Sequence, residues 1–275
     1  MSLSLQTNVT SLVAQQNLQT NTTSLDNAIT QLTSGYRINK SGDDAAGLAV
    51  ANGFRSNIAE LQQGVSNAND GTAILQTIDG GLNNISNILN QLQSLATQGA
   101  TGTFSGSYTT LNNEFQTLVG EITRQASNVG LASGGSYNVS LSVYIGGGNT
   151  VANSEVTINL SGSANTVDAT GLGLGSAKVD NASDAQSAIS SITAAVAQLG
   201  VVQGVVGDGE NDLTYAIGLA NSQITNESAA ESNIRDANIA QEASALTQQQ
   251  VLQQSSVAAL AQANSEPQAL LKLLQ

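Results

Sequence analysis

Few residues of this chain have the types and spacing that catalysis or metal binding requires. The neighbouring carboxylates Asp43 and Asp44 could hold a divalent cation, and residues 171–175 (GLGLG) could form a phosphate-binding loop. Carboxylates are also favoured where a helix begins, because its N-terminus carries a partial positive charge, and we interpret the pair in that way. The glycine segment lacks the Lys-Ser/Thr pair that ends a phosphate-binding loop, so we interpret it as a flexible loop.

Composition excludes several kinds of active site. The 275 residues include no Cys and no His, which excludes disulfides, thiol nucleophiles, Ser-His-Asp triads and histidine zinc sites. Tyrosines, lysines and carboxylates remain, but the sequence does not cluster them. We therefore expect no enzymatic activity, no cofactor and no metal. The sequons at Asn138, Asn159 and Asn181 are expected by chance in a chain so rich in Asn, Ser and Thr.

The charge balance limits the partners of the chain. Seven Lys and Arg residues oppose 20 Asp and Glu residues, which gives a net charge of −13. The basic residues are spread along the chain and form no patch that could follow a nucleic-acid backbone, and an acidic chain is repelled by anionic membranes. No run of ~18 apolar residues indicates a membrane span, and we expect no secretory signal peptide in residues 1–16.

The positions of apolar residues predict long helices. Apolar residues recur over 54–96 at steps of three and four, with one break in phase near Asp79, and predict a coiled-coil-like helix over about residues 43–98. At ~1.5 Å per residue this helix is roughly 80 Å long. The stripe comprises Phe54, Ile58, Leu61, Val65, Ala68, Thr72, Leu75, Ile78, Leu82, Ile85, Leu89, Leu92 and Ala96.

Two further stripes have the same spacing. Apolar residues over 111–129 predict a shorter helix, and those over 185–224 predict a second long helix. Ser183, followed three residues later by Gln186, is typical of a capping box at the start of that helix. The last stripe comprises Ala185, Ile189, Ile192, Val196, Leu199, Gln203, Val206, Leu213, Ile217, Ala220 and Ile224.

The period changes to two in the middle of the chain. Apolar residues alternate with polar ones over 137–145 and again over 156–160, with three consecutive glycines between the two runs. This pattern predicts a β-hairpin. Residues 161–178 are small and weakly patterned, and we interpret them as a loop that could contain a short strand.

Both ends of the chain are predicted to be helical but offer little apolar surface. Leu18, Leu25 and Leu32 recur every seven residues, and the single proline, Pro267, is predicted to interrupt the C-terminal helix. Since helices gain most of their stability from packing, we expect both ends to fold only against other copies of the chain. The residues expected to mediate polymerisation are Leu5, Val9, Leu12, Leu18, Leu25, Ile29, Leu32, Leu246, Leu252, Leu260, Leu270, Leu271 and Leu274.

These patterns predict a mainly α fold, an elongated coiled-coil-like helical rod with a small β-hairpin region. Residues 1–42 are expected to form an N-terminal helix and a connecting segment, and residues 43–130 the long N-terminal helices of the rod. Residues 131–182 are expected to form the hairpin and a variable loop region. The long C-terminal helix is expected over 183–236 and the last helix over 237–275.

Three stretches of the sequence resemble bacterial flagellins. They are SGYRINKSGDDAAG at 34–47, NANDG at 67–71, and the C-terminal stretch from Glu231, in which VLQQ and LAQAN blocks precede a proline and a Leu-rich end. The resemblance covers about residues 1–130 and 183–275. It implies a flagellin-like fold and a structural subunit that polymerises into the extracellular flagellar filament used for motility.

The resemblance also implies a route of assembly. In this family both terminal segments pair as coaxial helices in the filament core, and the long helices form the next shell. The subunit leaves the cell unfolded through the type III export apparatus, with an export chaperone, and polymerises between the cap and the hook-junction proteins. We therefore expect a secreted homopolymer in the bacterial flagellum, with no nucleic-acid partner and no membrane insertion.

One host interaction is implied as well. Flagellins that a Toll-like receptor senses share a pattern late in the first long helix, which Leu95, Ala96 and Gln98 match, as does Glu114 on the next helix. Gln93 stands where that pattern has Arg. Loss of the guanidinium removes a fork-shaped, charged hydrogen-bond donor, so we expect weakened recognition by the receptor.

Two other functions fit parts of the pattern. One is a hook–filament junction protein of the same family, and the other is a secreted helical adhesin or receptor ligand that does not polymerise. The LAQAN block before the proline and the Leu-rich end favours a filament subunit over a junction protein.

Overall fold

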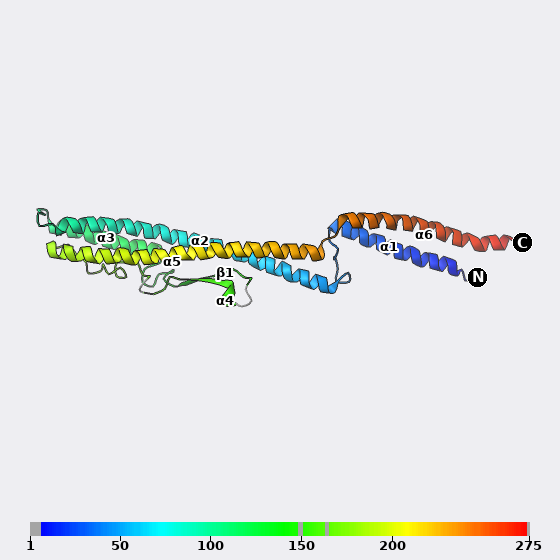
Figure 1. Ribbon diagram of the computed structural model, residues 1–275, viewed down its shortest axis with the longest axis horizontal. Coiled ribbons are helices and arrows are strands. Elements are labelled where there is room, and N and C mark those ends of the chain that lie inside the picture. Colours follow the sequence, from blue (N-terminus) through cyan, green and yellow to red (C-terminus); the bar gives the residue numbers. More distant parts are fainter. Residues whose placement is uncertain (1–6, 148–150, 163–164, 274–275) are drawn as a thin grey trace. The chain divides into compact units, whose positions relative to one another are not determined.

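The computed structural model describes residues 7–147, 151–162 and 165–273 (Figure 1). It is mostly helical, with one antiparallel pair of strands, which confirms the predicted mainly α fold with a small β-hairpin. The elements in chain order are α1 (Val9–Ser34), α2 (Ala45–Ala100), α3 (Tyr108–Asn128), β1 (Ser140–Tyr144), α4 (Val151–Ser154), β2 (Glu155–Asn159), α5 (Ala182–Arg235) and α6 (Ile239–Leu273).

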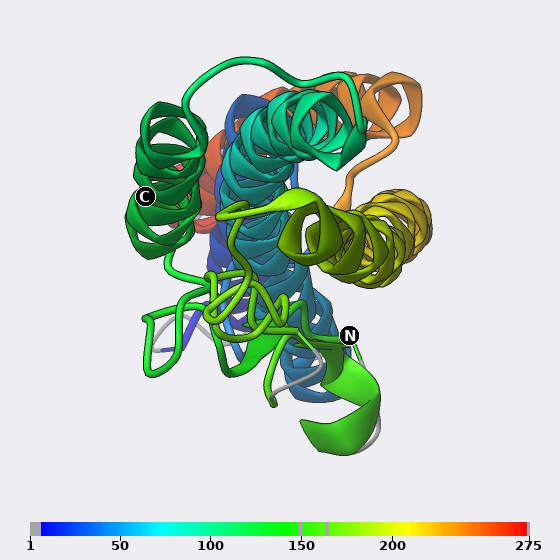
Figure 2. The same cartoon turned by 90° about the vertical axis from the view of Figure 1, so that its left-hand side faces the viewer.

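The chain divides into two units. Residues 57–225 form the central unit, and residues 1–56 together with 226–275 form the terminal unit. In the central unit α2, α3 and α5 lie side by side, and the hairpin lies along one side of them (Figure 2). Their apolar side chains form one core that includes the fully buried Phe115 and Leu75. Each such side chain contributes ~1.5–3 kcal/mol on burial, so this core holds the three helices together.

The buried stripe of α2 differs from the predicted one at its glycines. Val65 and Thr72 are only half-buried, whereas Gly64 and Gly71 are buried in their place. The stripe then keeps its alternating steps of three and four throughout, so the predicted break in phase near Asp79 is wrong. The buried positions of this stripe are Leu61, Gly64, Ala68, Gly71, Leu75, Ile78, Leu82, Ile85, Leu89, Leu92, Ala96 and Gly99.

A similar correction applies to α5. Val196 is 45% exposed and Gln203 is half-buried, so these two predicted core positions are wrong, and Ala195 and Val202 are buried instead. The other predicted positions that are only half-buried pack against the edge of the core; they are Ile189, Ile217 and Ile224. Regular steps of three and four again describe the buried face, as expected for coiled-coil packing. Its buried positions are Ala185, Ala188, Ile192, Ala195, Leu199, Val202, Val206, Gly209, Leu213 and Ala220.

The predicted hairpin is present. Its strands β1 and β2 pair antiparallel, with Ser140 opposite Asn159 and Val143 opposite Val156. One side chain near the middle of each strand, Val143 in β1 and Ile158 in β2, is buried in the core of the central unit. The alternating pattern therefore turns one face of the hairpin toward the helices, as period-two burial requires.

A glycine and two hydrogen bonds seat the hairpin on α2. A Cβ added at Gly64 would overlap the carbonyl oxygen of Ile145, so only glycine allows the two backbones to approach this closely. The Asn67 side-chain nitrogen donates to the Tyr144 carbonyl oxygen at 3.0 Å. The Tyr144 hydroxyl donates to the Glu60 carboxylate at 2.6 Å, and this bond raises the pKa of Tyr144.

The glycine-rich segment 171–175 is a loop, as predicted, but its leucines anchor it. Leu172 and Leu174 are buried in the core of the central unit. The Asp168 carboxylate accepts a hydrogen bond from the backbone nitrogen of Gly171 at 2.7 Å. The described residues between β2 and α5 form turns and bends but no strand. The leucines belong to the core, so the interpretation as a flexible loop is wrong.

The two adjacent carboxylates have different local roles. The Asp44 carboxylate accepts a hydrogen bond from the Gly47 backbone nitrogen at 2.8 Å, which confirms its predicted place at a helix start. The Asp43 carboxylate accepts from the backbone nitrogens of Asn39 and Lys40, each at 3.0 Å. These two bonds hold the pKa of Asp43 below its usual value. Asp43 therefore stabilises the turn that precedes α2.

The N-cap of α5 lies two residues before the predicted one, Ser183. The side-chain oxygen of Asn181 accepts from the Asp184 backbone nitrogen at 2.9 Å. Asn181 is therefore the N-cap, because α5 begins at Ala182. The prediction of a Ser183–Gln186 capping box is wrong.

In the terminal unit, α6 continues through Pro267 to Leu273, so the predicted interruption is wrong. A proline inside a helix has no N–H to donate to the carbonyl four residues earlier, which here belongs to Ala263. That carbonyl oxygen instead accepts a hydrogen bond from the Asn8 side chain at 2.8 Å. A donor from the other end of the chain thus replaces the one that the proline lacks.

Candidate assembly surface

The terminal unit is built on an antiparallel pair of helices, α1 and α6 (Figure 1). Small side chains lie between them: Ala28 and Ala263 are buried, as is Ser11. Small residues bury little apolar area, so polar contacts set the register of the pair. Three hydrogen bonds of 2.8 Å join Asn8 to the Ala263 carbonyl, the Ser11 hydroxyl to Asn264, and Asn21 to the Ser256 hydroxyl.

The predicted polymerisation residues fall into four groups. Leu5 and Leu274 lie outside the described residues, and Leu270 and Leu271 lie in the last turns of α6. Half-buried side chains are Leu18, Leu25, Leu32, Leu246 and Leu260. Exposed side chains are Val9, Leu12, Ile29 and Leu252. The exposed group presents apolar surface on both helices of the pair.

The sequence reading missed other exposed apolar residues on the same two helices. Val13, Ile239, Val251 and Val257 are each more than half exposed, from 51% to 56%. The prediction followed residues spaced seven apart and so passed over apolar neighbours that lie outside that spacing. Val13 lies next to Leu12 in the sequence. A prediction that treated the outward face of the helix as several residues wide would have included it. The apolar surface of the pair is therefore wider than predicted.

A short backbone junction lies beside the α1–α6 pair. The Ala237 backbone nitrogen donates to the Gly35 carbonyl oxygen at 2.9 Å, and the Arg37 nitrogen donates to the Arg235 carbonyl oxygen at 2.7 Å. Gly35 adopts a φ of +75°, a conformation that glycine allows without strain. These bonds form a small antiparallel bridge in which Tyr36 pairs with Asp236. The bridge joins the end of α1 to the segment just before α6.

Charged side chains reinforce this junction. The Arg235 guanidinium lies 4.0 Å from the centre of the Tyr36 ring, a cation–π contact. The Glu231 carboxylate lies 3.7 Å from Arg235 and 3.8 Å from Arg55. The Arg37 guanidinium also donates to a backbone carbonyl oxygen, that of Ile234. Three of the seven basic residues of this acidic chain, Arg37, Arg55 and Arg235, therefore lie at this junction. We interpret their contacts as holding the end of α1 beside the segment that precedes α6.

The residues implied in receptor recognition lie on α2 and α3. Gln98 and Glu114 are exposed, whereas Leu95 is half-buried against the core of the central unit. Gln93 is half-buried, and its side-chain oxygen has no hydrogen-bond partner among the described residues. Gln98 and Glu114 are thus the members of this set most accessible to a partner.

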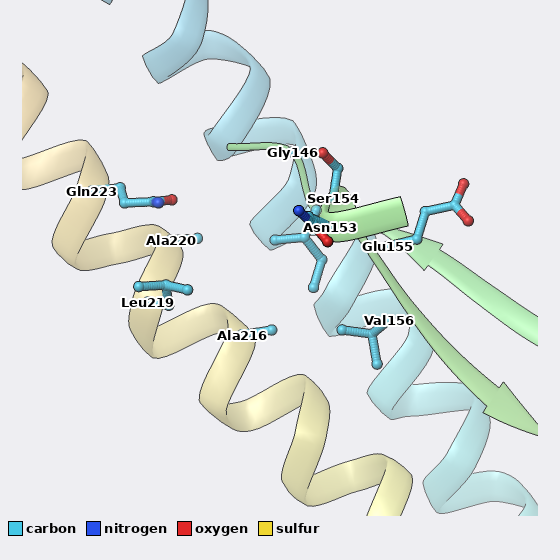
Figure 3. A pocket seen from close by; sticks show the side chains of 10 residues that line it. Gly146, Asn153, Ser154, Glu155, Val156, Ala216, Leu219, Ala220 and Gln223 are labelled. Carbon is cyan, nitrogen blue, oxygen red and sulfur yellow. The ribbon is translucent and has the colours of Figure 1, made fainter. Parts of the chain in front are cut away.

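The described residues offer little to a small-molecule ligand. The pocket between the hairpin and α5 has a volume of about 60 Å³ and is lined by residues such as Ser154, Ala216 and Gln223 (Figure 3). Two further pockets, one near Lys178 at the start of α5 and one between Tyr137 and α2, have volumes of about 190 and 200 Å³. All three are smaller than the ~300–1,000 Å³ of sites for drug-sized ligands. In the described part of the chain, no three carboxylates gather where they could hold a metal ion.

Comparisons with known proteins agree with the helical architecture of both ends. Residues 5–130 match the family model of the bacterial flagellin N-terminal helical region, and residues 187–274 match that of the C-terminal helical region. These two matches cover most of the chain, including α2 and α3 at one end and α6 at the other.

Relatives match over almost the whole length. A flagellin of Halalkalibacterium halodurans is 34% identical over 98% of both chains, and flagellin FlaB1 of Treponema pallidum is 32% identical over 98% of both. A solved structure of a Bacillus cereus flagellin covers 60% of this chain and 94% of its own, at 23% identity and a TM-score of 0.47. The family models and the full-length relatives together show that this chain belongs to the bacterial flagellin family.

Proposed function

We propose that α1 and α6 join copies of this flagellar filament subunit to one another. The observation that supports this proposal is the apolar surface of the α1–α6 pair: Val9 is 62% exposed and Leu12 is 55% exposed. Covering half of a leucine side chain contributes ~1 kcal/mol, and each copy carries several such side chains. The predicted division of the chain fits this role, with segments 1–42 and 237–275 proposed as the filament core.

A charge placed on this surface tests the proposal. In Leu12→Asp, assembly would bury an unpaired carboxylate, so we expect the critical concentration for seeded filament growth to rise at least ~10-fold, equivalent to ~1.4 kcal/mol. Leu12→Met conserves volume and apolarity and should grow like the unsubstituted chain. Light scattering measures growth, and circular dichroism checks that helix content is unchanged. Growth of Leu12→Asp at the unsubstituted rate would contradict the proposal.

We also infer that the terminal helices become stably folded only in the polymer. Large apolar side chains on both helices are exposed in the single chain, and the helices meet through small and polar residues. Hydrogen exchange should be fast over residues 9–34 in dilute subunits and slow in filaments, while residues 57–100 stay protected in both. Slow exchange over 9–34 in dilute subunits would refute the inference.

The route to the filament is a further part of the proposal. We propose that the subunit is secreted unfolded through the type III export apparatus, with an export chaperone, and assembles outside the cell between the cap and the hook-junction proteins. Family membership supports this route, and a chain without cysteine cannot be trapped by disulfides on the way. The chain should be absent from the medium of cells that lack the export apparatus. Its continued secretion there would exclude the route.

Recognition by the host Toll-like receptor is proposed to be weak. The half-buried Gln93 lacks the positive charge and the fork of donors that Arg supplies to a partner. In a cell reporter assay, Gln93→Arg should therefore raise the receptor response to the purified subunit. Gln93→Lys restores charge without the fork and serves as the matched control. An unchanged response to Gln93→Arg would contradict this assignment.

A further inference from the structure

The junction beside the α1–α6 pair contains a larger apolar anchor than the pair itself. The junction comprises residues 35–51 and 231–237. Ile38, between α1 and α2, is 1% exposed, and Ala51 of α2 is fully buried. A Cβ added at Gly47 would lie 2.9 Å from the Ile38 side chain, so the isoleucine rests on the first turns of α2. Among the described residues of α1 and α6, the buried ones are smaller and comprise Ser11, Ala28 and Ala263.

The bridge within the junction is held by contacts that involve no residue of α1 or α6. The Arg37 backbone nitrogen donates to the Arg235 carbonyl oxygen, and the Ala237 nitrogen donates to the Gly35 carbonyl oxygen. The Arg235 guanidinium covers the Tyr36 ring, and only 17% of the arginine side chain is exposed. A cation–π contact is stronger when the cation is shielded from water. These contacts can therefore persist while α1 and α6 are unfolded.

Both long helices that enter the junction are anchored outside it. α2 continues from the junction to Ala100, and α5 reaches the junction from Ala182. Both helices carry the core of the central unit over residues 57–225. Extending an existing helix adds one hydrogen bond per residue, whereas starting a helix is costly. The turns of α2 and α5 in the junction therefore extend helices that the core already stabilises, whereas α1 and α6 must each be started anew.

The junction also shortens the loop that pairing must close. α1 ends next to Gly35, and α6 begins two residues after Ala237. Once the bridge has formed, the adjoining ends of the two helices already lie side by side. A first contact at the far end of the pair, such as that of Ser11 with Asn264, would close a much longer loop. Because the entropic cost of closing a loop rises with its length, pairing that starts at the junction is the least costly.

We propose that the junction is already folded in the dilute subunit and is the nucleus from which α1 and α6 pair during assembly. The two helices then form from the junction toward the chain ends, and Asn8 and Ala263 bond late. This inference rests on the proposed function, in which α1 and α6 become stably folded only in the polymer. Tyr36 and Arg235 are positioning residues in this sequence of events, because their contact sets which turns of α1 and α6 meet first.

Hydrogen exchange of single amides, followed by NMR in the dilute subunit, tests whether the junction is folded before assembly. The amides of Arg37 and Ala237 should exchange at least ~10-fold more slowly than those of residues 9–34, because their hydrogen bonds do not depend on α1 or α6. Tyr36→Leu should remove that protection, and Tyr36→Phe, which keeps the ring beneath Arg235, should retain it. Equally fast exchange in the junction and over 9–34 would overturn the inference.

The rate of seeded filament growth tests the order of pairing. A contact formed at the start of folding affects the forward rate, whereas a contact formed late affects mainly the reverse rate. Tyr36→Leu should therefore slow growth on seeds at least ~5-fold, and Tyr36→Phe should grow like the unsubstituted chain. Asn21→Ala removes the bond to Ser256 within the pair, so it should keep the growth rate within ~2-fold and speed the loss of subunits from filaments. Circular dichroism checks that the helix content of each variant is unchanged.

The outcomes separate this inference from the proposed function. If Tyr36→Leu grows like the unsubstituted chain, or if Asn21→Ala slows growth as strongly as Tyr36→Leu does, pairing does not start at the junction. The inference then fails and the proposed function stands. If the unsubstituted chain does not grow on seeds, the proposed function itself fails.

Discussion

Asn8 is expected to stabilise the terminal helices through two separable hydrogen bonds. Its side-chain oxygen accepts from the Ser11 backbone nitrogen at 3.1 Å and caps α1. Its side-chain nitrogen donates to the Ala263 carbonyl oxygen at 2.8 Å. Pro267 cannot make the helical hydrogen bond to that carbonyl, so Asn8 couples the start of α1 to the one proline of the chain.

Each bond has an expected magnitude. Loss of an N-cap costs ~1 kcal/mol, and loss of a donor that leaves a carbonyl unpaired costs ~1 kcal/mol or more. Asn8→Ala should therefore destabilise the α1–α6 pair by ~2 kcal/mol in total. Asn8→Asp keeps the capping oxygen but loses the donor, so it should cost ~1 kcal/mol. In a Pro267→Ala background, the new backbone N–H at position 267 can donate to the Ala263 carbonyl oxygen. Asn8→Ala should then destabilise the pair only by the loss of the N-cap, ~1 kcal/mol.

Hydrogen exchange in assembled filaments measures these differences over residues 257–266 of α6. Relative to its parent, Asn8→Ala should speed exchange there by ~30-fold with Pro267 and by ~5-fold with Pro267→Ala, since 1–2 kcal/mol corresponds to a factor of ~5–30. The ratio of the two effects is the coupling between Asn8 and Pro267. An equal effect in both backgrounds, or an Asn8→Asp filament that exchanges like the unsubstituted one, would refute the reasoning.

Three further predictions concern other parts of the chain. Hydrogen bonds from Arg124 and Gln125 lower the pKa of Glu121 to about 2, so the stability that ionised Glu121 contributes is complete above its ordinary pKa of 4.5 and is lost as pH falls toward 2. An NMR titration should find this low pKa, and in Arg124→Ala the pKa should return toward 4.5. Gly64→Ala should destabilise the central unit by ~1–3 kcal/mol, whereas Gly80→Ala should stabilise it by ~0.5–1 kcal/mol, because a Cβ at Gly80 meets no atom within 4 Å. If the two variants shift the thermal unfolding temperature in the same direction, the packing argument is contradicted. Removal of residues 267–275 should abolish filament growth in electron micrographs and leave the helix content of the central unit unchanged; normal filaments would exclude a role for that segment.

Periodicity was sufficient to predict which segments are helices. The stripes over 54–96 and 185–224 each fall within one helix, the stripe over 111–129 ends at the residue that follows α3, and the alternating runs are found in one hairpin. Long regular patterns succeed because a helix or strand with an apolar face is stable only when that face is covered. Several details depended instead on contacts between distant parts of the chain, which no local pattern contains.

Pro267 illustrates that limit. A proline within a helical pattern predicts a break, because the carbonyl of Ala263 loses its donor. The helix continues because Asn8, at the other end of the sequence, supplies one. Only the pairing of α1 with α6 brings the two together. Likewise, the N-cap of α5 is Asn181 and not Ser183, a local choice between two capping residues that spacing alone did not decide.

The glycines explain the errors in the core stripes. A prediction from spacing ranks positions by their side chains, and glycine has none. It therefore places Val65 and Thr72 of α2 in the core and leaves out Gly64 and Gly71. The core positions are nevertheless the glycines, because other parts of the chain occupy the space that their side chains would fill. At Gly64 this space is taken by the backbone of Ile145, and at Gly71 by the side chains of Val143 and Leu213. A glycine at a regular core spacing in a long helix therefore predicts that another chain segment packs directly against the helix backbone there.

The error on α5 concerns the size of the buried residues. The predicted core positions Val196 and Gln203 each lie one residue after a position that is buried, Ala195 and Val202. Val196 faces outward, although burying a valine would stabilise the subunit more than burying an alanine does. Side-chain size therefore does not decide which face of α5 is buried. The regular steps of three and four decide it, because they keep one side of a long helix against its neighbours, and on α5 these steps include the small residues Ala185, Ala188 and Ala195.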